Sequence, residues 1–355
     1  MKKIILISLM LMGGLLLAQD PASSQFFFNP MYLNPAFAGT TKGGRVGGVY
    51  RNQWPNVPSK FVTYNAWGDI YNPLFHGGLG FIAQQDISGE GLMKTTTFGL
   101  IQSFERAIPK IVRIRAGYNV SMINKRVDWS KLVFSDQLDA VQGQIYQSKA
   151  IPGAAAGKIM VDFDAGFMLD FPKFRLKESQ ITNTFGYVAN HLTQPNQALT
   201  GGNAPLPMKH TVHYTMVISI ADNNPNEKSL YISPNIIWEK QGNFTTSNFG
   251  FYVTRDPLIA GLFYRKKQTL NFKDSDAFIL YLGLRKELSE TVAMRVGYSY
   301  DVTISRLTSN TMGSHEVSLI FEFKRAELFS KNHKLHKRNK RAMECEDFGS
   351  KSMIF

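Results

Sequence analysis

Residues 112–122 read V-R-I-R-A-G-Y-N-V-S-M, from Val112 to Met122. Every even position in this run is apolar or aromatic, whereas the odd positions hold arginine, glycine, asparagine or serine. Successive side chains of a β-strand point to opposite faces, so the pattern predicts a strand with one apolar face and one polar, basic face. Two folds are compatible with it. A soluble sandwich would bury the apolar face, and a membrane barrel would turn that face to lipid and the polar face to the lumen.

Similar segments repeat along the chain and are separated by turn signals such as Asn72-Pro73, Asn224-Pro225 and Asp256-Pro257. We predict strands at 44–53, 59–69, 77–86, 94–105, 111–126, 157–171, 180–191, 208–220, 229–239, 244–254, 258–267, 276–286, 292–302 and 313–323. This gives about 14 strands, with 12 or 16 also possible. Single-chain outer-membrane barrels have an even number of antiparallel strands.

The length of the strands and the start of the chain favour the membrane. The predicted strands run to about 10–12 residues, against the five or six usual in soluble sheets. Lys2 and Lys3 precede an apolar run from Ile4 to Leu17, which predicts a signal peptide at 1–18, cut after Ala18. No later run of 18 apolar residues is present, so a membrane span must use strands. We therefore expect an all-β transmembrane antiparallel barrel over 43–324, in the outer membrane of a Gram-negative bacterium.

Residues 19–42 do not fit a strand. The run Gln25 to Gly39 is rich in aromatic residues and is broken by Pro30 and Pro35. Because so many aromatic side chains require burial, we expect this segment either to plug the barrel or to lie beneath it on the periplasmic side, as an arm with aromatic anchors.

Loop lengths predict the topology. If residues 19–43 start in the periplasm, the long segments 127–156 and 192–207 both fall on the external side, as in barrels with short periplasmic turns. An even strand count then returns the C-terminus to the periplasm. The tail 325–355 is basic there, and we predict that it either docks an acidic partner or is a solvated tail. Its docking candidates are Lys331, Lys334, Lys337, Arg338, Lys340 and Arg341.

The polar faces of the strands supply candidate lumen residues. They are Arg113, Arg115, Asn119, Asp162, Asp164, Arg295 and Asp301. A lumenal salt network, with the two aspartates opposite or near the arginines, is the simplest interpretation, and a permeation site is the alternative. The seven histidines are scattered and no catalytic or phosphate-binding motif is recognisable. We expect no enzyme activity, no cofactor and no resident metal.

Three sets of residues together resemble one family. They are the run Asn34-Pro35-Ala36-Phe37-Ala38-Gly39 after an aromatic stretch, then Arg51 and Trp54 within Tyr50-Arg51-Asn52-Gln53-Trp54-Pro55, then Gly78-Leu79-Gly80 leading to Asp86 and Gly89. In these residues, and in its length and layout, the chain resembles the PorP/SprF family of outer-membrane proteins, which belong to the type IX secretion and gliding machinery of Bacteroidetes. The resemblance implies a β-barrel that supports secretion or surface attachment of proteins with a C-terminal targeting domain, such as gliding adhesins. It also implies partners among the periplasmic ring or lipoprotein components.

The residues alone leave a second function open. Arg113, Arg115 and Arg295 on the polar face would suit a small-solute porin or transporter that prefers anions. An outer-membrane enzyme is a third possibility that no recognisable site supports. The preferred hypothesis is a non-enzymatic secretion barrel, and no nucleic-acid partner is expected in this compartment.

Overall fold

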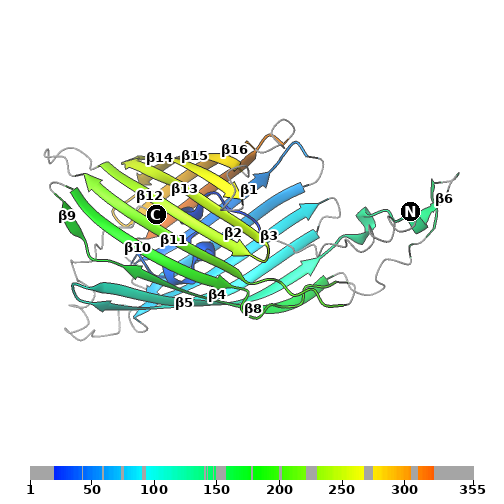
Figure 1. The fold of residues 1–355 in the computed structure, drawn as a ribbon, viewed down its shortest axis with the longest axis horizontal. Helices are drawn as coiled ribbons and strands as arrows, with labels where there is room; N and C mark the ends of the chain where they lie inside the picture. The colour runs from blue at the N-terminus through cyan, green and yellow to red at the C-terminus, as the bar shows by residue number, and fades with distance from the viewer. Residues whose placement is uncertain are drawn as a thin grey trace, which may run out of the picture.

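The chain forms one closed barrel in the computed structural model (Figure 1). The structure describes residues 20–323 except 42, 58–59, 73–75, 90–92, 140, 142, 147, 149–156, 177–178, 200–201, 221–229, 268–274 and 305–310. The predicted signal peptide and basic tail therefore lie outside the described residues. Within the described part, no helix is long and apolar enough to cross a membrane.

Fourteen long strands build the wall, each antiparallel to its neighbours. They are β1 (Gly44–Gln53), β2 (Lys60–Asn72), β3 (Gly77–Gly89), β4 (Met93–Ile108), β5 (Val112–Arg126), β8 (Gly157–Asp170), β10 (Ser179–Asn190), β11 (Lys209–Ile220), β12 (Leu230–Gln241), β13 (Phe244–Arg255), β14 (Leu258–Lys267), β15 (Ser275–Glu287), β16 (Val292–Thr303) and β17 (Ser314–Phe323). The barrel closes where β1 pairs with β17, from Gly44↔Phe323 to Gln53↔Ser314. The predicted fold and strand number are confirmed, and every predicted strand overlaps one observed strand.

Three short strands are described besides the fourteen long ones, and one of them, β9, belongs to the same sheet. The strand β9 (Phe174–Leu176) pairs with the start of β10. The strands β6 (Leu138–Asp139) and β7 (Gly143–Gln144) pair with each other in the segment between β5 and β8. That segment also holds two 3₁₀ turns, η3 (Trp129–Lys131) and η4 (Ser135–Gln137), and it projects well beyond the barrel in Figure 1. We call residues 127–148 the arm, and we call the barrel end that carries it the long-loop end.

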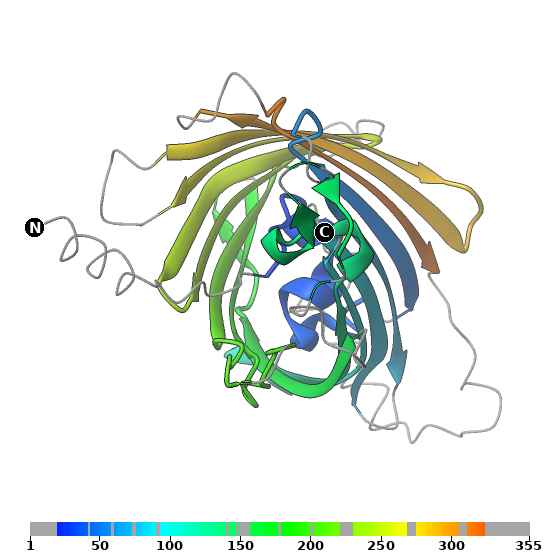
Figure 2. The same ribbon diagram turned by 90° about the vertical axis from the view of Figure 1, so that its right-hand side faces the viewer.

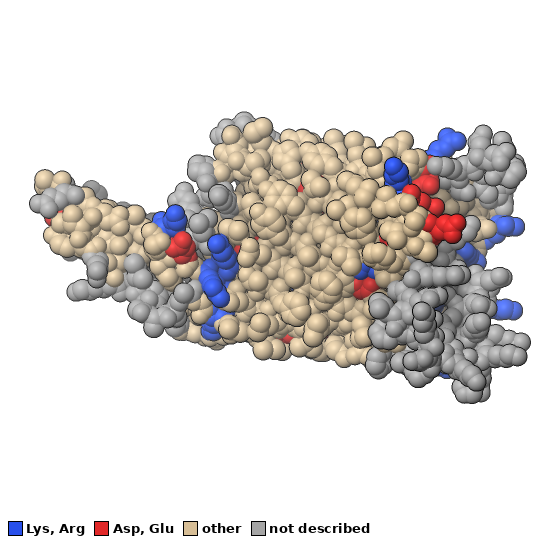
Figure 3. All heavy atoms as spheres, turned by 180° about the vertical axis from the view of Figure 1, so that it is seen from behind, with Lys and Arg blue, Asp and Glu red and all other residues tan. Residues whose placement is uncertain are grey.

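The alternation that predicts the strands also sets which way their side chains face. On β5 the apolar residues Ile114, Val120 and Met122 are exposed on the outer surface, whereas Arg113 and Arg115 are buried inside. Figure 3 shows the result on one side of the molecule. Charged side chains gather towards the two ends, and the middle of the surface is nearly free of them. Such an uncharged belt is suited to the hydrocarbon layer of an outer membrane.

The N-terminal segment lies inside the barrel (Figure 2). It contains η1 (Phe26–Phe28), α2 (Pro30–Leu33) and η2 (Pro35–Phe37), all three far too short to be stable alone. Phe26, Phe27 and Phe28 are buried against inward aromatic residues of the wall, so this segment provides much of the core. We call residues 20–41 the plug.

The plug runs along the lumen from one end to the other. Asp20 contacts His191, Lys209 and Gln241, which lie at the long-loop end, whereas Gly39 contacts the first residues of β3 at the opposite end. The expectation that residues 19–43 start on the side of the short turns is therefore wrong for Asp20. Only the exit of the segment, next to β1, lies on that side.

Candidate functional site

The C-terminal half of the plug is anchored by the motif Asn34 to Gly39. The Oδ1 atom of Asn34 accepts a hydrogen bond from the Ala36 N–H at 2.9 Å and thereby caps η2. Its Nδ2 atom donates to the main-chain oxygens of Phe167 and Tyr187, at 3.2 and 3.3 Å. Phe37 then stacks on His213, with 5.4 Å between ring centroids. The motif therefore holds the plug against β8, β10 and β11.

Glycines of the wall make this close approach possible. A Cβ atom built on Gly117 of β5 would lie 2.6 Å from the main-chain nitrogen of Ala36. One built on Gly166 of β8 would lie 2.4 Å from the Asn34 Oδ1 atom. Both distances are well below van der Waals contact, so any larger side chain at either position would displace the plug. The glycine at the centre of the run 112–122 is thus part of the plug seat.

The last turn of the plug is fixed by a buried ion pair. Gly39 adopts a left-handed φ of +73°, which favours glycine, and its N–H donates to the Asp69 carboxylate at 2.7 Å. Arg45 donates to both oxygens of Asp69 at 2.9 Å, and also to the Phe37 carbonyl at 3.0 Å. The main chains of Gly39 and Gly78 pack directly against each other.

A second charged cluster holds the N-terminal half of the plug where β1 pairs with β17. Arg51 on β1 pairs with Asp301 on β16 at 3.0 Å and with Glu316 on β17 at 2.9 Å. Arg265 on β14 also pairs with Asp301, at 2.9 Å. The Ser24 hydroxyl lies between these four groups: it donates to Asp301 at 2.6 Å and accepts from both arginines at 2.7 Å. The plug therefore connects the first and last strands of the barrel.

A third charged cluster lies at the long-loop end. The carboxylate of Asp20 lies 2.9 Å from the His191 Nε2 atom and 3.5 Å from the Lys209 Nζ atom. The Nδ1 atom of His191 bonds Asp162 on β8. Burial alone would lower the pKa of His191, but the Asp20 charge and the hydrogen bonds to Asp162 and Asp20 outweigh it and raise this pKa to about 10. Burial would raise the pKa of Asp20, but His191 and Lys209 lower it. Both groups are therefore charged at neutral pH.

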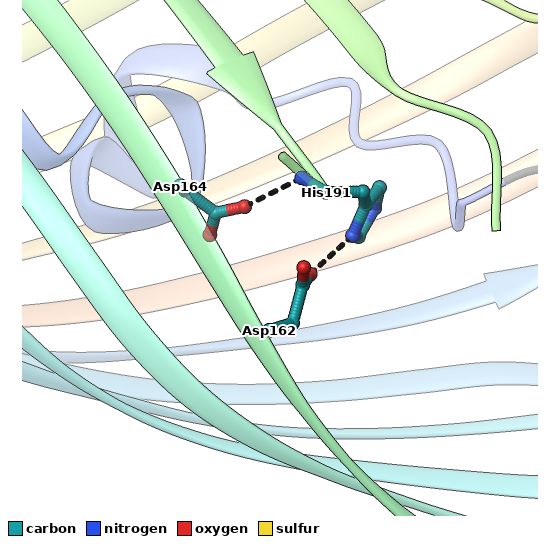
Figure 4. A group of neighbouring side chains, drawn as sticks. All are labelled: Asp162, Asp164 and His191. Atoms are coloured by element: carbon teal, nitrogen blue, oxygen red, sulfur yellow. Dashed lines mark hydrogen bonds and ion pairs between the residues drawn. The ribbon is translucent and has the colours of Figure 1, made fainter. Parts of the chain in front are cut away.

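Three of these side chains could also hold a cation. The ligand atoms of Asp162, Asp164 and His191 lie within 4.8 Å of one another (Figure 4). Each already has partners, however. His191 lies between Asp162 and Asp20, and Asp164 accepts from Asn119 Nδ2 at 2.8 Å and from the His191 N–H at 2.9 Å. The arrangement is that of a charged histidine fixed by carboxylates.

The predicted lumen residues all have buried side chains on the inner face, but they form separate groups. Arg115 pairs with Glu105 at 3.2 Å and with Asp170 at 2.8 Å, and Arg295 pairs with Glu322 at 2.9 Å. The expected proximity of Asp162 and Asp164 to the arginines is not observed. Their partners are His191, Thr193 and Asn119, because β10 ends beside β8 and turns inward there.

Other predicted residues have structural positions. Trp54 has a left-handed φ of +56° just after β1, and its N–H donates to the Gly313 carbonyl at 2.8 Å. Pro35 and Ala38 are buried in the plug. The six basic tail residues lie outside the described part of the chain.

The sequence interpretation missed several charged residues of the site: Arg45, Asp69, His191, Lys209, Arg265 and Glu316. Glu316 lies on the face opposite Val317 and Leu319, so the parity test that identified Arg295 could have found it. Arg265 had no such signal, because both faces of β14 are largely apolar and Lys266 follows it. His191 had no such signal, since it follows β10 with a φ of +58°.

Comparison with known proteins gives the family. Among solved structures, a Pseudomonas aeruginosa FadL homologue is 13% identical with a TM-score of 0.41, and 88% of this chain and 96% of that chain are covered. The TodX monoaromatic hydrocarbon channel deltaS2 mutant is 10% identical with a TM-score of 0.42, over 82% and 91%. CdiB from Acinetobacter baumannii is 6% identical with a TM-score of 0.42, over 79% and 60%. At these identities and TM-scores, no conclusion about this chain is drawn from the likeness.

The search of curated proteins found no match. The family model for the type IX secretion system membrane protein PorP/SprF matches residues 16–321, which is nearly the whole described chain. The motif that anchors the plug and the arginine that joins β1 to β17 both lie within this match. The chain belongs to the PorP/SprF family of type IX secretion system membrane proteins.

Proposed function

We propose that this outer-membrane barrel has no enzymatic activity and acts as a docking platform in type IX secretion. In this role it supports the secretion or surface attachment of proteins that carry a C-terminal targeting domain, gliding adhesins among them. Membership of the PorP/SprF family supports a role in type IX secretion, and a lumen occupied by the plug supports docking rather than passage of solutes. A barrel whose interior is occupied by its own plug has to recognise partners at its ends.

The observation that carries the proposal is the arm at the long-loop end. It is an ordered unit, in which the Gln137 carbonyl accepts from the Ile145 and Tyr146 N–H groups at 3.0 and 3.2 Å. Yet the Val141 side chain is 92% exposed, and those of Ile145 and Tyr146 are about half exposed. Apolar side chains presented together on a projecting structure are typical of protein interaction sites. We assign to the arm the contact with the secreted protein.

The opposite end is assigned to the machinery in the periplasm. The tail 325–355 carries its cations without an intervening acid over Lys331 to Arg341. Such a segment suits an acidic surface on a ring or lipoprotein component. Removal of residues 325–355 should release such components while secreted proteins are still bound.

Affinity purification from detergent-solubilised outer membrane tests this function. The wild-type barrel should co-purify with a secreted protein that has a type IX C-terminal domain, identified by mass spectrometry. Replacing Val141, Ile145 and Tyr146 together by serine should remove that protein. The matched control is Leu288→Ser, since Leu288 is equally exposed in a turn at the other end. Recovery of neither a type IX substrate nor a ring component with the wild type would contradict the proposal.

The porin alternative predicts a different measurement. It rests on the arginine-bearing polar face, but Arg115 and Arg295 each have a carboxylate within 3.2 Å, and the plug packs against inward residues of the wall. We expect little conductance from the wild-type barrel in planar bilayers. A large anion-selective current from the wild type would favour the porin.

A further inference from the structure

The first residues of the plug are held like a bound peptide. We call residues 20–25 the mouth segment. It has no helix or strand, and three of its main-chain N–H groups donate to side chains of the barrel wall. The Asp20 N–H donates to the Gln241 Oε1 atom at 2.9 Å, and the N–H groups of Ser24 and Gln25 donate to the Glu316 carboxylate at 2.8 and 3.2 Å. Partner side chains that satisfy a peptide backbone in this way form a peptide-binding groove.

The groove ends in a site for a carboxylate. Three donors from different strands or loops converge on Asp20: His191 Nε2 at 2.9 Å, Lys209 Nζ at 3.5 Å and Gln241 Nε2 at 3.3 Å. Lys209 keeps a second carboxylate, Glu239, at 3.6 Å. The wall cations therefore remain compensated when Asp20 leaves, and the cost of vacating the site is moderate.

There is space at both sides of the mouth segment. A cavity of about 150 Å³ lies towards β3, β4, β5 and β8, and one of about 370 Å³ lies towards β12 to β17 and β1 to β3. Asp20 and Pro21 line both cavities, so the segment crosses the long-loop end of the lumen between them. Together the two cavities leave space beside the groove into which a second chain can enter or the mouth segment can move.

The mouth segment and the motif Asn34 to Gly39 are held by different groups of the wall, and the Tyr32 hydroxyl, which donates to the Pro21 carbonyl at 2.6 Å, joins the mouth segment to the rest of the plug. From Asn34 to Gly39 the plug rests on Gly117, Gly166 and Gly78 through close main-chain packing and on a buried ion pair. The mouth segment depends instead on charged and amide side chains at the long-loop end. Residues 20–25 can therefore leave their groove without opening the barrel.

We propose that this groove is a peptide-binding site, and that residues 20–25 are its resident occupant. The ligand is an extended segment of a secreted partner that carries a carboxylate, which takes the place of Asp20 between His191, Lys209 and Gln241. This assignment rests on the proposed function for the source of the partner. Because the resident is tethered, it competes at a high effective concentration, so a partner that is also bound elsewhere, as on the arm, displaces it at a much lower concentration than a free peptide does.

A synthetic peptide tests the site on the purified full chain in detergent. The probe is the hexapeptide Asp-Pro-Ala-Ser-Ser-Gln, the sequence of residues 20–25, acetylated, amidated and labelled with an uncharged dye. Fluorescence anisotropy should show that the D20N variant binds it about tenfold more tightly than the wild type, because the resident carboxylate is gone. Adding Lys209→Gln to D20N should reverse this gain. The control probe begins with Asn instead of Asp and should bind D20N at least tenfold more weakly.

Equal affinity of wild type and D20N for the probe would overturn the inference, as would equal binding of the Asp and Asn probes. If D20N does not fold, which heat-modifiable migration in gels reveals, the wild type gives the answer. A spin label at Ala22 should become mobile when unlabelled Asp probe is added in excess, and its immobility would refute displacement. Recovery of secreted partners by a barrel that ignores the probe would reject this site and leave the proposed function intact.

Discussion

Gly117→Ala is expected to destabilise the barrel although the backbone there can accept alanine. The new Cβ would lie 2.6 Å from the Ala36 nitrogen and the Pro35 carbonyl carbon. These are main-chain atoms, which cannot rotate away as a side chain could. Removing an overlap of nearly an ångström requires the plug to shift, and overpacking of this kind costs about 1–3 kcal/mol.

The effect on the unfolded chain has the opposite sign. Replacing glycine by alanine where the backbone permits it stabilises by about 0.4–1 kcal/mol, because the unfolded chain loses freedom. Gly48 is the matched control: it also lies in a strand, and its Cβ would meet only the Asn65 carbonyl oxygen at 3.5 Å. We therefore expect Gly48→Ala to be neutral or slightly stabilising. Because the unfolded-chain effect is common to both variants, they should differ by the overpacking cost, about 1–3 kcal/mol.

Urea titration of the barrel folded into lipid vesicles measures this difference, with the folded fraction read from heat-modifiable migration. The plug could instead leave an intact barrel, so chymotrypsin is added in parallel. The plug residues Phe26 and Phe37 are buried in the wild type and become cleavable only when it is released. If Gly117→Ala matches Gly48→Ala in both the urea midpoint and protease resistance, the plug seat described here is wrong.

Three further changes test the faces, the closure and the mouth. Val120→Arg should cost about 2–4 kcal/mol of folding free energy in the same titration if Val120 lies near the bilayer centre, whereas Val141→Arg on the arm should cost almost nothing. Arg51→Met should cost about 3–5 kcal/mol, because it removes the cation paired with the buried Glu316 and leaves Asp301 with Arg265 alone. His191→Gln should free a spin label at Ala22 at neutral pH. In the wild type the His191 contribution is complete below its ordinary pKa near 6.5 and is lost as pH rises through about 10, so the label should stay immobile until alkaline pH.

Strand positions were predictable because each long strand carries its own evidence. The alternation within residues 112–122 identifies β5 and its faces without any knowledge of neighbouring strands. The range 44–53 was predicted to the residue, since Trp54-Pro55 ends the strand locally. Closure follows from the same local pattern, because an even series of such strands can satisfy its edges only by joining first to last.

Contacts of the plug could not be predicted in the same way. The hydrogen bond from the Ser24 N–H to Glu316 joins residues 292 positions apart, and no local pattern encodes that pairing. Parity gives the face of a side chain but not its partner, which is why Asp162 was expected near arginines and lies against His191. His191 reaches it only through a left-handed residue after β10, a conformation that a histidine adopts when tertiary contacts hold it.

The position of the family motif bears on where specificity resides. Asn34 to Gly39 face glycines of the barrel wall inside the lumen, so these residues specify how the plug is seated rather than what the barrel binds. Changes there should alter stability and leave partner choice unaffected. Recognition requires surfaces that a partner can reach, and our proposals place it at the exposed arm and at the mouth segment between its two cavities. On these proposals, two barrels that share the seated plug would differ in partner through changes in those two regions.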